Sequence, residues 1–178
     1  NSQCLAANSF SANNLSTIAV GGGTLSYGWK FGNGKSDVAT NPTWSYTATN
    51  TYTVTLYAIS SNFCIDSVKK ILSVNPNPKV SFNLSDSVKC LRNNEFKLTN
   101  TSTISSGTLY YNWDFGNSQK SSGTSPIMNY ISEGNYFIKL VAKSALGCSD
   151  SISKLVKVFA QPTAKFTVNS QMQCLKGN

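Results

Sequence analysis

The sequence predicts an all-β protein built from two tandem modules, each a small β-sandwich or barrel. First, Trp29-Lys30-Phe31-Gly32-Asn33 returns 84 positions later as Trp113-Asp114-Phe115-Gly116-Asn117. Second, apolar residues alternate with polar ones over many short stretches, which is the period of a half-buried strand, and no segment has helical spacing. Third, Gly, Asn and Pro separate these stretches, as turns do. A repeat of this length indicates two modules that each have their own core.

The repeat extends over nearly the whole chain and sets the expected domain boundaries. The shift of 84 carries Cys64 onto Cys148, and a shift of 86 ahead of the motif carries Cys4 onto Cys90. A third copy of that segment begins at Cys174. We therefore expect a first module at residues 1–76 that lacks its first strand, a complete second module at residues 77–160, and the first strand of a third repeat at residues 161–178.

Alternation predicts five main strands in the second module, and all but the first of them return in the first module. They cover residues 80–84, 96–98, 111–115, 136–142 and 152–158. Gly32 and Gly116 are expected to close a hairpin after the third strand, where a positive φ is needed. Asn50 replaces Gly134 before the fourth strand, which predicts one left-handed conformation at both positions. Pro76, Pro78 and Pro162 are expected to stiffen short linkers between modules.

The aromatic motif resembles a known family. Tyr-x-Trp-x-Phe-Gly-Asn, a tyrosine 17 residues after the tryptophan, and Gly/Asn-x-Tyr before a long strand are similar to the PKD domain. That domain is an immunoglobulin-like β-sandwich common in extracellular proteins. The resemblance implies two tandem PKD-type sandwiches with a buried tryptophan on the third strand. The core motif would then be Trp29, Phe31, Gly32, Trp113, Phe115 and Gly116.

Shorter motifs resemble repeats of giant surface adhesins from gliding bacteria that use type IX secretion. They are Gly-Cys-x-Asp-Ser at 147–151, Pro-x-Ala-x-Phe at 162–166 and Gln-Cys-Leu-x-Gly-Asn at 173–178. This resemblance implies a stalk or adhesin repeat of a large secreted bacterial cell-surface protein, in gliding motility or surface attachment. The alternatives are a carbohydrate-binding module and a non-catalytic spacer of a secreted hydrolase. Asp-Ser-hydrophobic triplets similar to that group's O-glycosylation acceptor place candidate sites at Ser67, Ser87 and Ser151.

Composition argues against catalysis, cofactors and nucleic acid as a partner. The chain has no histidine, so the commonest general base and metal ligand are missing. The net charge of +8 comes almost entirely from lysines, with Arg92 as the single arginine, whereas nucleic-acid sites favour clustered arginine. Asn33 and Asn117 replace the aspartate of the PKD motif, and no metal is expected.

No run is apolar and long enough for membrane insertion. The expected partners are neighbouring repeats of the same chain, with a surface polysaccharide as the alternative.

Five cysteines lie at two repeated positions, and no Cys-x-x-Cys pattern indicates zinc. Disulfides in an oxidising compartment are favoured over free thiols. The cysteines are Cys4, Cys90 and Cys174 at one position, and Cys64 and Cys148 at the other. In an immunoglobulin-like sandwich, the loops that hold Cys90 and Cys148 would lie at opposite ends, too far apart for a bridge. We therefore favour Cys4–Cys148 between modules, with Cys90–Cys148 within one module as the alternative.

The sequence leaves the role of two further features undecided. Trp44 follows an apparent loop, Asn-Pro-Thr, and is expected to be half-buried by packing, with stacking on a sugar ring as the alternative. The last segment repeats a first strand without the module that follows it. We expect Ala164, Phe166 and Val168 to fill the vacant first-strand position in the first module of a neighbouring molecule.

Overall fold

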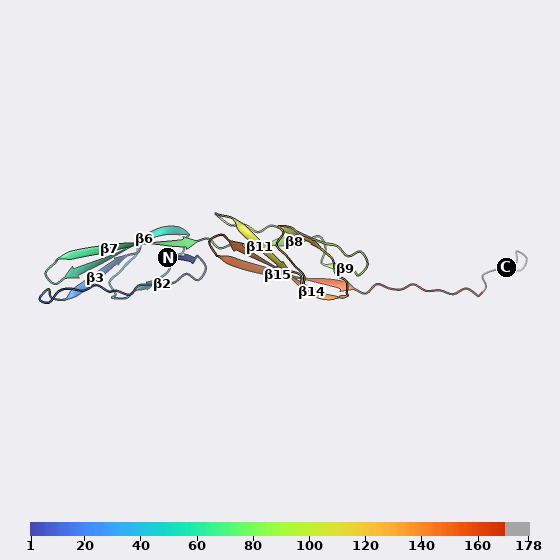
Figure 1. The fold of residues 1–178 in the computed structure, drawn as a ribbon, viewed down its shortest axis with the longest axis horizontal. Helices are drawn as coiled ribbons and strands as arrows, with labels where there is room; N and C mark the ends of the chain where they lie inside the picture. Colours follow the sequence, from blue (N-terminus) through green and yellow to red (C-terminus); the bar gives the residue numbers. More distant parts are fainter. Residues whose placement is uncertain (170–178) are drawn as a thin grey trace, which may run out of the picture.

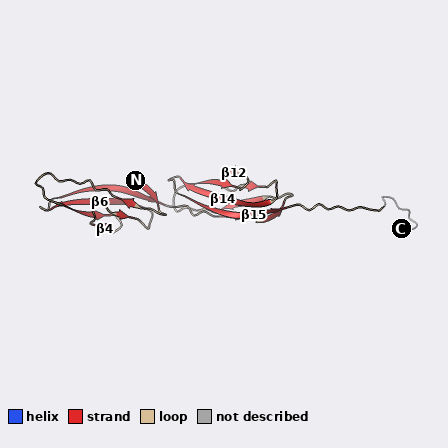
Figure 2. Ribbon diagram, turned by 90° about the horizontal axis from the view of Figure 1, so that it is seen from below, coloured by secondary structure: helices blue, strands red, loops and turns tan. Residues whose placement is uncertain are grey.

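The computed structural model describes residues 1–169, and within that range it contains strands, turns and loops but no helix. Two elongated modules lie end to end, and residues 161–169 continue away from the second module as a single exposed segment (Figure 1). The view from below shows the same end-to-end order (Figure 2). The predicted all-β class with two modules is confirmed.

The second module is a sandwich of two sheets. One sheet has the order β13-β10-β8 and the other β12-β11-β14-β15-β9. The strands are β8 (Phe82–Leu84), β9 (Val88–Cys90), β10 (Phe96–Asn100), β11 (Leu109–Asp114), β12 (Lys120–Ser121), β13 (Ile127–Met128), β14 (Gly134–Ser144) and β15 (Ser149–Phe159). Before β8, Lys79 forms a bridge with Thr103 and extends the pairing toward the linker.

The first module repeats this plan with one strand fewer. Its sheets have the orders β1-β7-β6-β3-β4 and β2-β5. The strands are β1 (Ser2–Cys4), β2 (Phe10–Ser11), β3 (Leu25–Lys30), β4 (Ser36–Asp37), β5 (Thr43–Trp44), β6 (Asn50–Ser60) and β7 (Ile65–Asn75). Among the described residues, no strand pairs with β2 at the place that β8 takes beside β10.

Two short parallel strands are an addition to the sequence-based prediction. β1 pairs with β7 and β9 pairs with β15, both in parallel register. Cys90 therefore lies in a short strand between β8 and β10, where the sequence predicted a loop. Three-residue strands such as Val88-Lys89-Cys90 are too short to display an alternating pattern, so periodicity could not find them.

The core of each module forms around a tryptophan on the third main strand. Trp113 is 1% exposed and meets Phe82 edge to face, with ring centroids 5.0 Å apart. Its indole N–H donates to the Gly123 carbonyl over 2.9 Å, so the buried polar group is satisfied. Trp29 repeats this hydrogen bond in the first module and donates to the Ala39 carbonyl over 2.9 Å.

A glycine closes the hairpin after each tryptophan strand. Gly32 and Gly116 both have a φ of +76°, as expected. A Cβ at Gly116 would come within 2.9 Å of the Phe137 carbonyl oxygen, so both the backbone angle and the close approach require glycine. The predicted shared left-handed geometry at Gly134 and Asn50 is wrong. Gly134 has a φ of +153°, whereas Asn50 is not among the residues with positive φ.

Replacing the second-module tryptophan should destabilise that module strongly. We expect Trp113→Ala to lower the free energy of unfolding by about 3–5 kcal/mol, since a buried aromatic ring and its hydrogen bond are lost. Chemical denaturation followed by tyrosine and tryptophan fluorescence measures this. Tyr110→Ala, on the same strand but 59% exposed, is the control and should cost less than about 1 kcal/mol. A loss below that value for Trp113→Ala would contradict the described core.

Comparing Gly116→Ala with Gly107→Ala separates the energetic cost of a close contact from the cost of a positive φ. Gly107 also has a positive φ, +95°, but a Cβ there would meet nothing within 4 Å. Both substitutions should cost about 1 kcal/mol for the left-handed angle, and Gly116→Ala should cost roughly 1–3 kcal/mol more. Thermal unfolding of the two variants side by side tests this. Equal losses would mean that the hairpin can move away from β14.

Candidate functional site at the module junction

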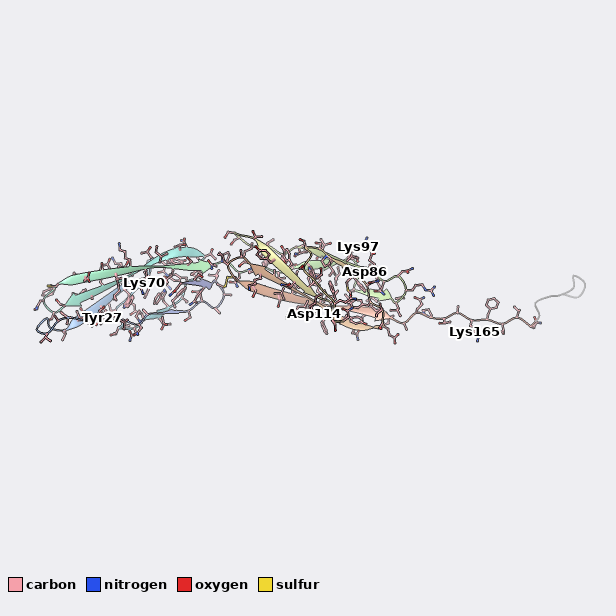
Figure 3. All side chains as sticks on the ribbon, viewed as in Figure 1. Tyr27, Lys70, Asp86, Lys97, Asp114 and Lys165 are labelled. Atoms are coloured by element: carbon pink, nitrogen blue, oxygen red, sulfur yellow. A yellow bond between two sulfur atoms is a disulfide. The ribbon has the colours of Figure 1, made fainter. Side chains whose placement is uncertain are left out.

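The two modules are joined covalently at a second point besides the linker. A disulfide connects Cys4, at the end of β1, to Cys148, between β14 and β15, with 5.6 Å between the Cα atoms. It closes a sequence separation of 144 residues. Figure 3 shows the side chains at this junction, where the end of the first module meets the start of the second. This is the inter-module pairing that the sequence analysis favours over a bridge within one module.

Hydrogen bonds hold the linker beside the disulfide. The Leu5 N–H donates to the Asn75 carbonyl over 2.8 Å, and the Ala6 N–H donates to Asn77 Oδ1 over 2.7 Å. Pro78 is buried at the start of the second module. The three residues between Asn75 and Lys79, two of them proline, leave little chain free to hinge. Asn77 had no signal in the sequence, because its role depends on a contact across 71 positions.

A buried asparagine clamps the start of each module, and the sequence analysis missed it. Asn94 Nδ2 donates to the carbonyls of Leu91 and Tyr130, and its Oδ1 accepts from the Tyr130 N–H at 2.7 Å. Asn8 makes the same three bonds in the first module, to Leu5 and Tyr46. Asn8 and Asn94 are related by the shift of 86, and this match was the sequence signal that could have identified them.

A buried tyrosine then ties this clamp to the aromatic motif. The Tyr130 hydroxyl donates to the Phe115 carbonyl over 2.8 Å, and the Tyr46 hydroxyl donates to the Phe31 carbonyl over 2.7 Å. Desolvation by burial raises the pKa of both Tyr46 and Tyr130 above the ordinary tyrosine value. Both therefore remain neutral donors throughout the physiological pH range. Phe31 and Phe115 are buried beside them, as predicted for the core motif.

The remaining cysteines are placed differently. Cys64 and Cys90 are free thiols and exposed. Cys64 holds in the first module the position that Cys148 holds in the second, and Cys90 likewise corresponds to Cys4. Cys174 lies outside the described residues.

Trp44 lies in a strand and packs against aromatic rings. The expected loop covers Asn41 and Pro42 but not Thr43, because Thr43–Trp44 form β5 and pair with β2. Its ring stacks on Phe31 at 4.5 Å between centroids and lies 6.0 Å from Phe10. The ring is partly buried, and its indole N–H is buried without a hydrogen-bond partner in the described chain. The ring is thus half-buried by packing, and it also lines the groove described next.

A groove of about 470 Å³ opens in the first module between the two sheets. It is lined mainly by apolar residues, and residues 11–16 contribute to its lining. The side chains from the larger sheet are Trp29, Val54, Leu56, Val68, Lys70 and Leu72.

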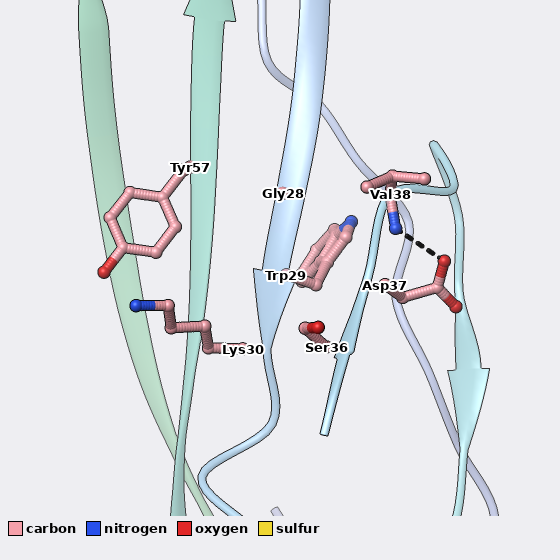
Figure 4. A pocket seen from close by; sticks show the side chains of 7 residues that line it. All are labelled: Gly28, Trp29, Lys30, Ser36, Asp37, Val38 and Tyr57. Atoms are coloured by element: carbon pink, nitrogen blue, oxygen red, sulfur yellow. Dashed lines mark hydrogen bonds between the residues drawn. The ribbon is translucent and has the colours of Figure 1, made fainter. Parts of the chain in front are cut away.

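A second depression, of about 450 Å³, lies over β3, β4 and β6 (Figure 4). Lys30 lies over the Tyr57 ring, with Nζ 5.5 Å from the ring centroid. Asp37 Oδ1 accepts the N–H groups of Val38 and Ala39 at 2.6 and 2.9 Å, so this carboxylate caps its own turn. Within residues 1–169, no three Cys, Asp or Glu side chains gather as metal ligands. No helix in that range is long and apolar enough to cross a membrane.

The three candidate O-glycosylation serines are accessible. Ser67, Ser87 and Ser151 are all exposed. The Ser67 and Ser151 N–H groups are bound by the carboxylates of Asp66 and Asp150 over 2.8 and 2.7 Å. Their modification stays a prediction.

Two packed sheets, a buried tryptophan on the third main strand and a tyrosine bonded back to the chain define an immunoglobulin-like sandwich. Two family models, both described as PKD domain, match residues 2–62 and residues 75–159. The chain therefore consists of two tandem PKD domains followed by the segment from residue 160 onward.

Individual proteins of several kinds are similar to parts of the chain. The pre-pro-metalloprotease PrtV of Vibrio cholerae is 38% identical over 60 residues, which is 33% of this chain and 6% of that protein. The crystal structure of its PKD1 domain is 32% identical, covers 47% of this chain and 98% of that chain, and has a TM-score of 0.42. The PKD1 domain of Vibrio anguillarum Epp is 28% identical, covers 49% of this chain and 99% of that chain, with a TM-score of 0.43.

Proposed function

We propose that this chain is a non-catalytic spacer whose PKD domains are held in a fixed line by the Cys4–Cys148 disulfide. The disulfide is the observation that carries the proposal, because it adds a second covalent tie to a linker of three residues. Two ties at separate points remove most of the hinge and twist freedom that a single short linker retains. A unit of this kind holds whatever follows it at a set distance from whatever precedes it.

The proposed setting is the surface of a bacterial cell, as a stalk or adhesin repeat of a large secreted protein. A disulfide requires an oxidising compartment, which supports a location outside the cytoplasm. The resemblance of the cysteine motifs to adhesin repeats supports attachment or gliding motility as the process. The rival is a spacer within a secreted hydrolase, supported by the similarity to a pre-pro-metalloprotease. The sequences on either side of this segment distinguish the two, since many further copies favour the adhesin and a catalytic domain favours the hydrolase.

Removing the bridge should set the two domains free relative to each other. In the Cys4→Ser/Cys148→Ser variant we expect the domains to tumble separately, so their NMR rotational correlation times should diverge and shorten. The Cys64→Ser/Cys90→Ser variant, which removes the exposed free thiols, is the matched control and should tumble as one body. If the Cys4→Ser/Cys148→Ser variant also tumbles as one body, the linker alone holds the two domains in a fixed arrangement. The disulfide is then not needed for the proposed spacer function.

Polysaccharide binding remains the second candidate, supported by Trp44 at the groove and by the lysine-rich surface. It predicts that a glycan array gives signals that fall about tenfold or more in Trp44→Ala, the usual size of a lost stacking contact. Tyr110→Ala, an exposed aromatic in the other domain, is the control. A silent array with the unmodified chain would rule out this candidate for the sugars it carries.

A further inference from the structure

Gly28 is a glycine that the fold itself does not need. It lies within β3, and because its neighbour Trp29 faces the core, Gly28 faces away from it. Gly28 is not among the glycines with positive φ, and a Cβ built there would meet nothing within 4 Å. Glycine inside a strand is destabilising, and it often marks a place where a ligand comes close to the backbone. A ligand above Gly28 would explain its presence.

The open space above Gly28 belongs to the depression of about 450 Å³ over β3, β4 and β6, which we call the β3 depression. Tyr57 is the partner of Gly28 on β6, and Val38 lies on the other side, directly after β4 (Figure 4). The Tyr57 ring is partly buried, and Val38 is 80% exposed. An aromatic wall and an aliphatic wall thus flank a floor of bare backbone. Ligand sites typically enclose about 300–1,000 Å³, so a group the size of one sugar ring fits.

The charges around the β3 depression favour an anion. The Lys30 ammonium lies 5.5 Å from the Tyr57 ring centroid and forms no salt bridge within residues 1–169. Among the described residues that line the depression, Asp37 has the only carboxylate, and its Oδ1 accepts the two N–H groups of its own turn. Lys69 lies in the same row of the sheet as Lys30, with Thr55 between them. The outward positions of β3, β6 and β7, all in the described chain, carry these two lysines and no acidic residue.

The second domain keeps the fold and changes the side chains of the β3 depression. The residues that the shift of 84 places at the positions of its glycine, tyrosine and lysine are Asn112, Val141 and Asp114. The tryptophan, phenylalanine and glycine of the core motif are the same in both copies. The second domain thus has a side chain in place of the bare backbone, no aromatic ring, and a carboxylate in place of the ammonium. The depression is therefore a property of the first domain and is not required by the sandwich.

We propose that the β3 depression binds one hexuronate residue of an acidic polysaccharide. The sugar ring lies over Gly28, with its C–H face against the Tyr57 ring. The exposed Lys30 side chain turns from the ring to the sugar carboxylate, because a charge-assisted hydrogen bond is stronger than a cation–π contact at an exposed site. Lys69 continues the positive row toward the next sugar residue. This inference rests on polysaccharide binding, the second candidate function, and does not depend on the spacer role.

A sugar fits the β3 depression better than a nucleic acid does. Proteins that bind single-stranded nucleic acid stack successive bases on several aromatic rings along a basic groove. On the outward positions of β3, β6 and β7, Tyr57 is the only aromatic residue. One ring beside a bare backbone floor and one ammonium matches a single sugar residue with a single carboxylate.

Isothermal titration calorimetry of the whole chain with tetragalacturonate tests this site. We expect a Kd of about 1 mM or tighter at low salt, and at least about tenfold weaker binding of the methyl ester, which keeps the rings and lacks the charge. Gly28→Asn, which introduces the residue of the second domain, should weaken tetragalacturonate binding at least about tenfold, and so should Tyr57→Ala. Tyr110→Ala removes an exposed tyrosine from the outward face of the second domain and should leave the Kd unchanged.

A pair of lysine variants separates the site from general attraction to the basic chain. Lys30→Gln and Lys139→Gln each remove one positive charge, and Lys139 lies on the outward face of β14 in the second domain. Only Lys30→Gln should weaken tetragalacturonate binding, by about tenfold, and it should also remove the preference over the methyl ester. Equal weakening by the two variants, or equal binding of the acid and its ester by the unmodified chain, would overturn the proposal.

NMR titration of the unmodified chain locates the site without relying on any variant to fold. The largest changes in amide chemical shift on adding tetragalacturonate should fall at Gly28, Val38 and Tyr57. If they fall around Trp44 or in the second domain, the chain binds the sugar elsewhere, so the β3 site is wrong while polysaccharide binding stands.

Two further results would overturn the β3 site. Equal binding of oligothymidylate or polyglutamate of the same charge would show a surface for polyanions in general. The absence of heat and of shift changes at about 10 mM tetragalacturonate would exclude a hexuronate ligand. If a glycan array is silent as well, the polysaccharide candidate falls together with this site, whereas a positive array would remove the site alone.

Discussion

Burial of one tryptophan between two sheets is the constraint on which each domain depends. The ring needs an apolar partner from the opposite sheet, a carbonyl for its N–H, and a hairpin that turns away without disturbing the next strand. In the second domain Phe82 is the apolar partner, the Gly123 carbonyl accepts the Trp113 N–H, and Gly116 brings the hairpin against β14 where a Cβ would collide. The Phe115 carbonyl also accepts the Tyr130 hydroxyl. Because each contact fixes the next, the motif can be recognised in two copies whose remaining residues differ widely.

The sequence was informative where the physical cause is local or periodic. Alternation located the long strands, the twofold motif located the core, and sandwich topology indicated that Cys148 would bond to Cys4 and not to Cys90. It was uninformative where structure depends on a few residues or on distant partners. The parallel strands β1 and β9 are too short to show a period, and Thr43–Trp44 pairs as a strand only because β2 lies beside it. The exchange of Gly134 for Asn50 was misjudged, since Asn50 does not adopt a positive φ.

Comparison of the two domains measures what one strand contributes. With β8 in place, Phe82, Phe96, Ile138, Leu140 and Val156 are fully buried. Without a counterpart to β8, the first domain keeps the same order in its larger sheet and the same hairpin. The equivalents of the last four residues, Phe10, Val54, Leu56 and Leu72, are 5–7% exposed there, and Val68 is 53% exposed. The larger sheet and the clamp formed by Asn8 are thus sufficient to define the fold, while the first strand completes the burial.

The disulfide also decides which part of the chain would bear a mechanical load. Tension applied between Asn1 and the C-terminal segment passes through residues 1–4, crosses the sulfur–sulfur bond at Cys148, and follows β15 out of the molecule. The residues enclosed by the 144-residue separation, which include nearly all of the first domain and most of the second, lie outside this covalent path. An unbridged polypeptide can lengthen by about 3.3–3.6 Å per residue pulled straight. Here the disulfide keeps the enclosed residues from extending under tension, so the pair of domains would resist stretching. Reduction of the Cys4–Cys148 bond would allow all of these residues to extend.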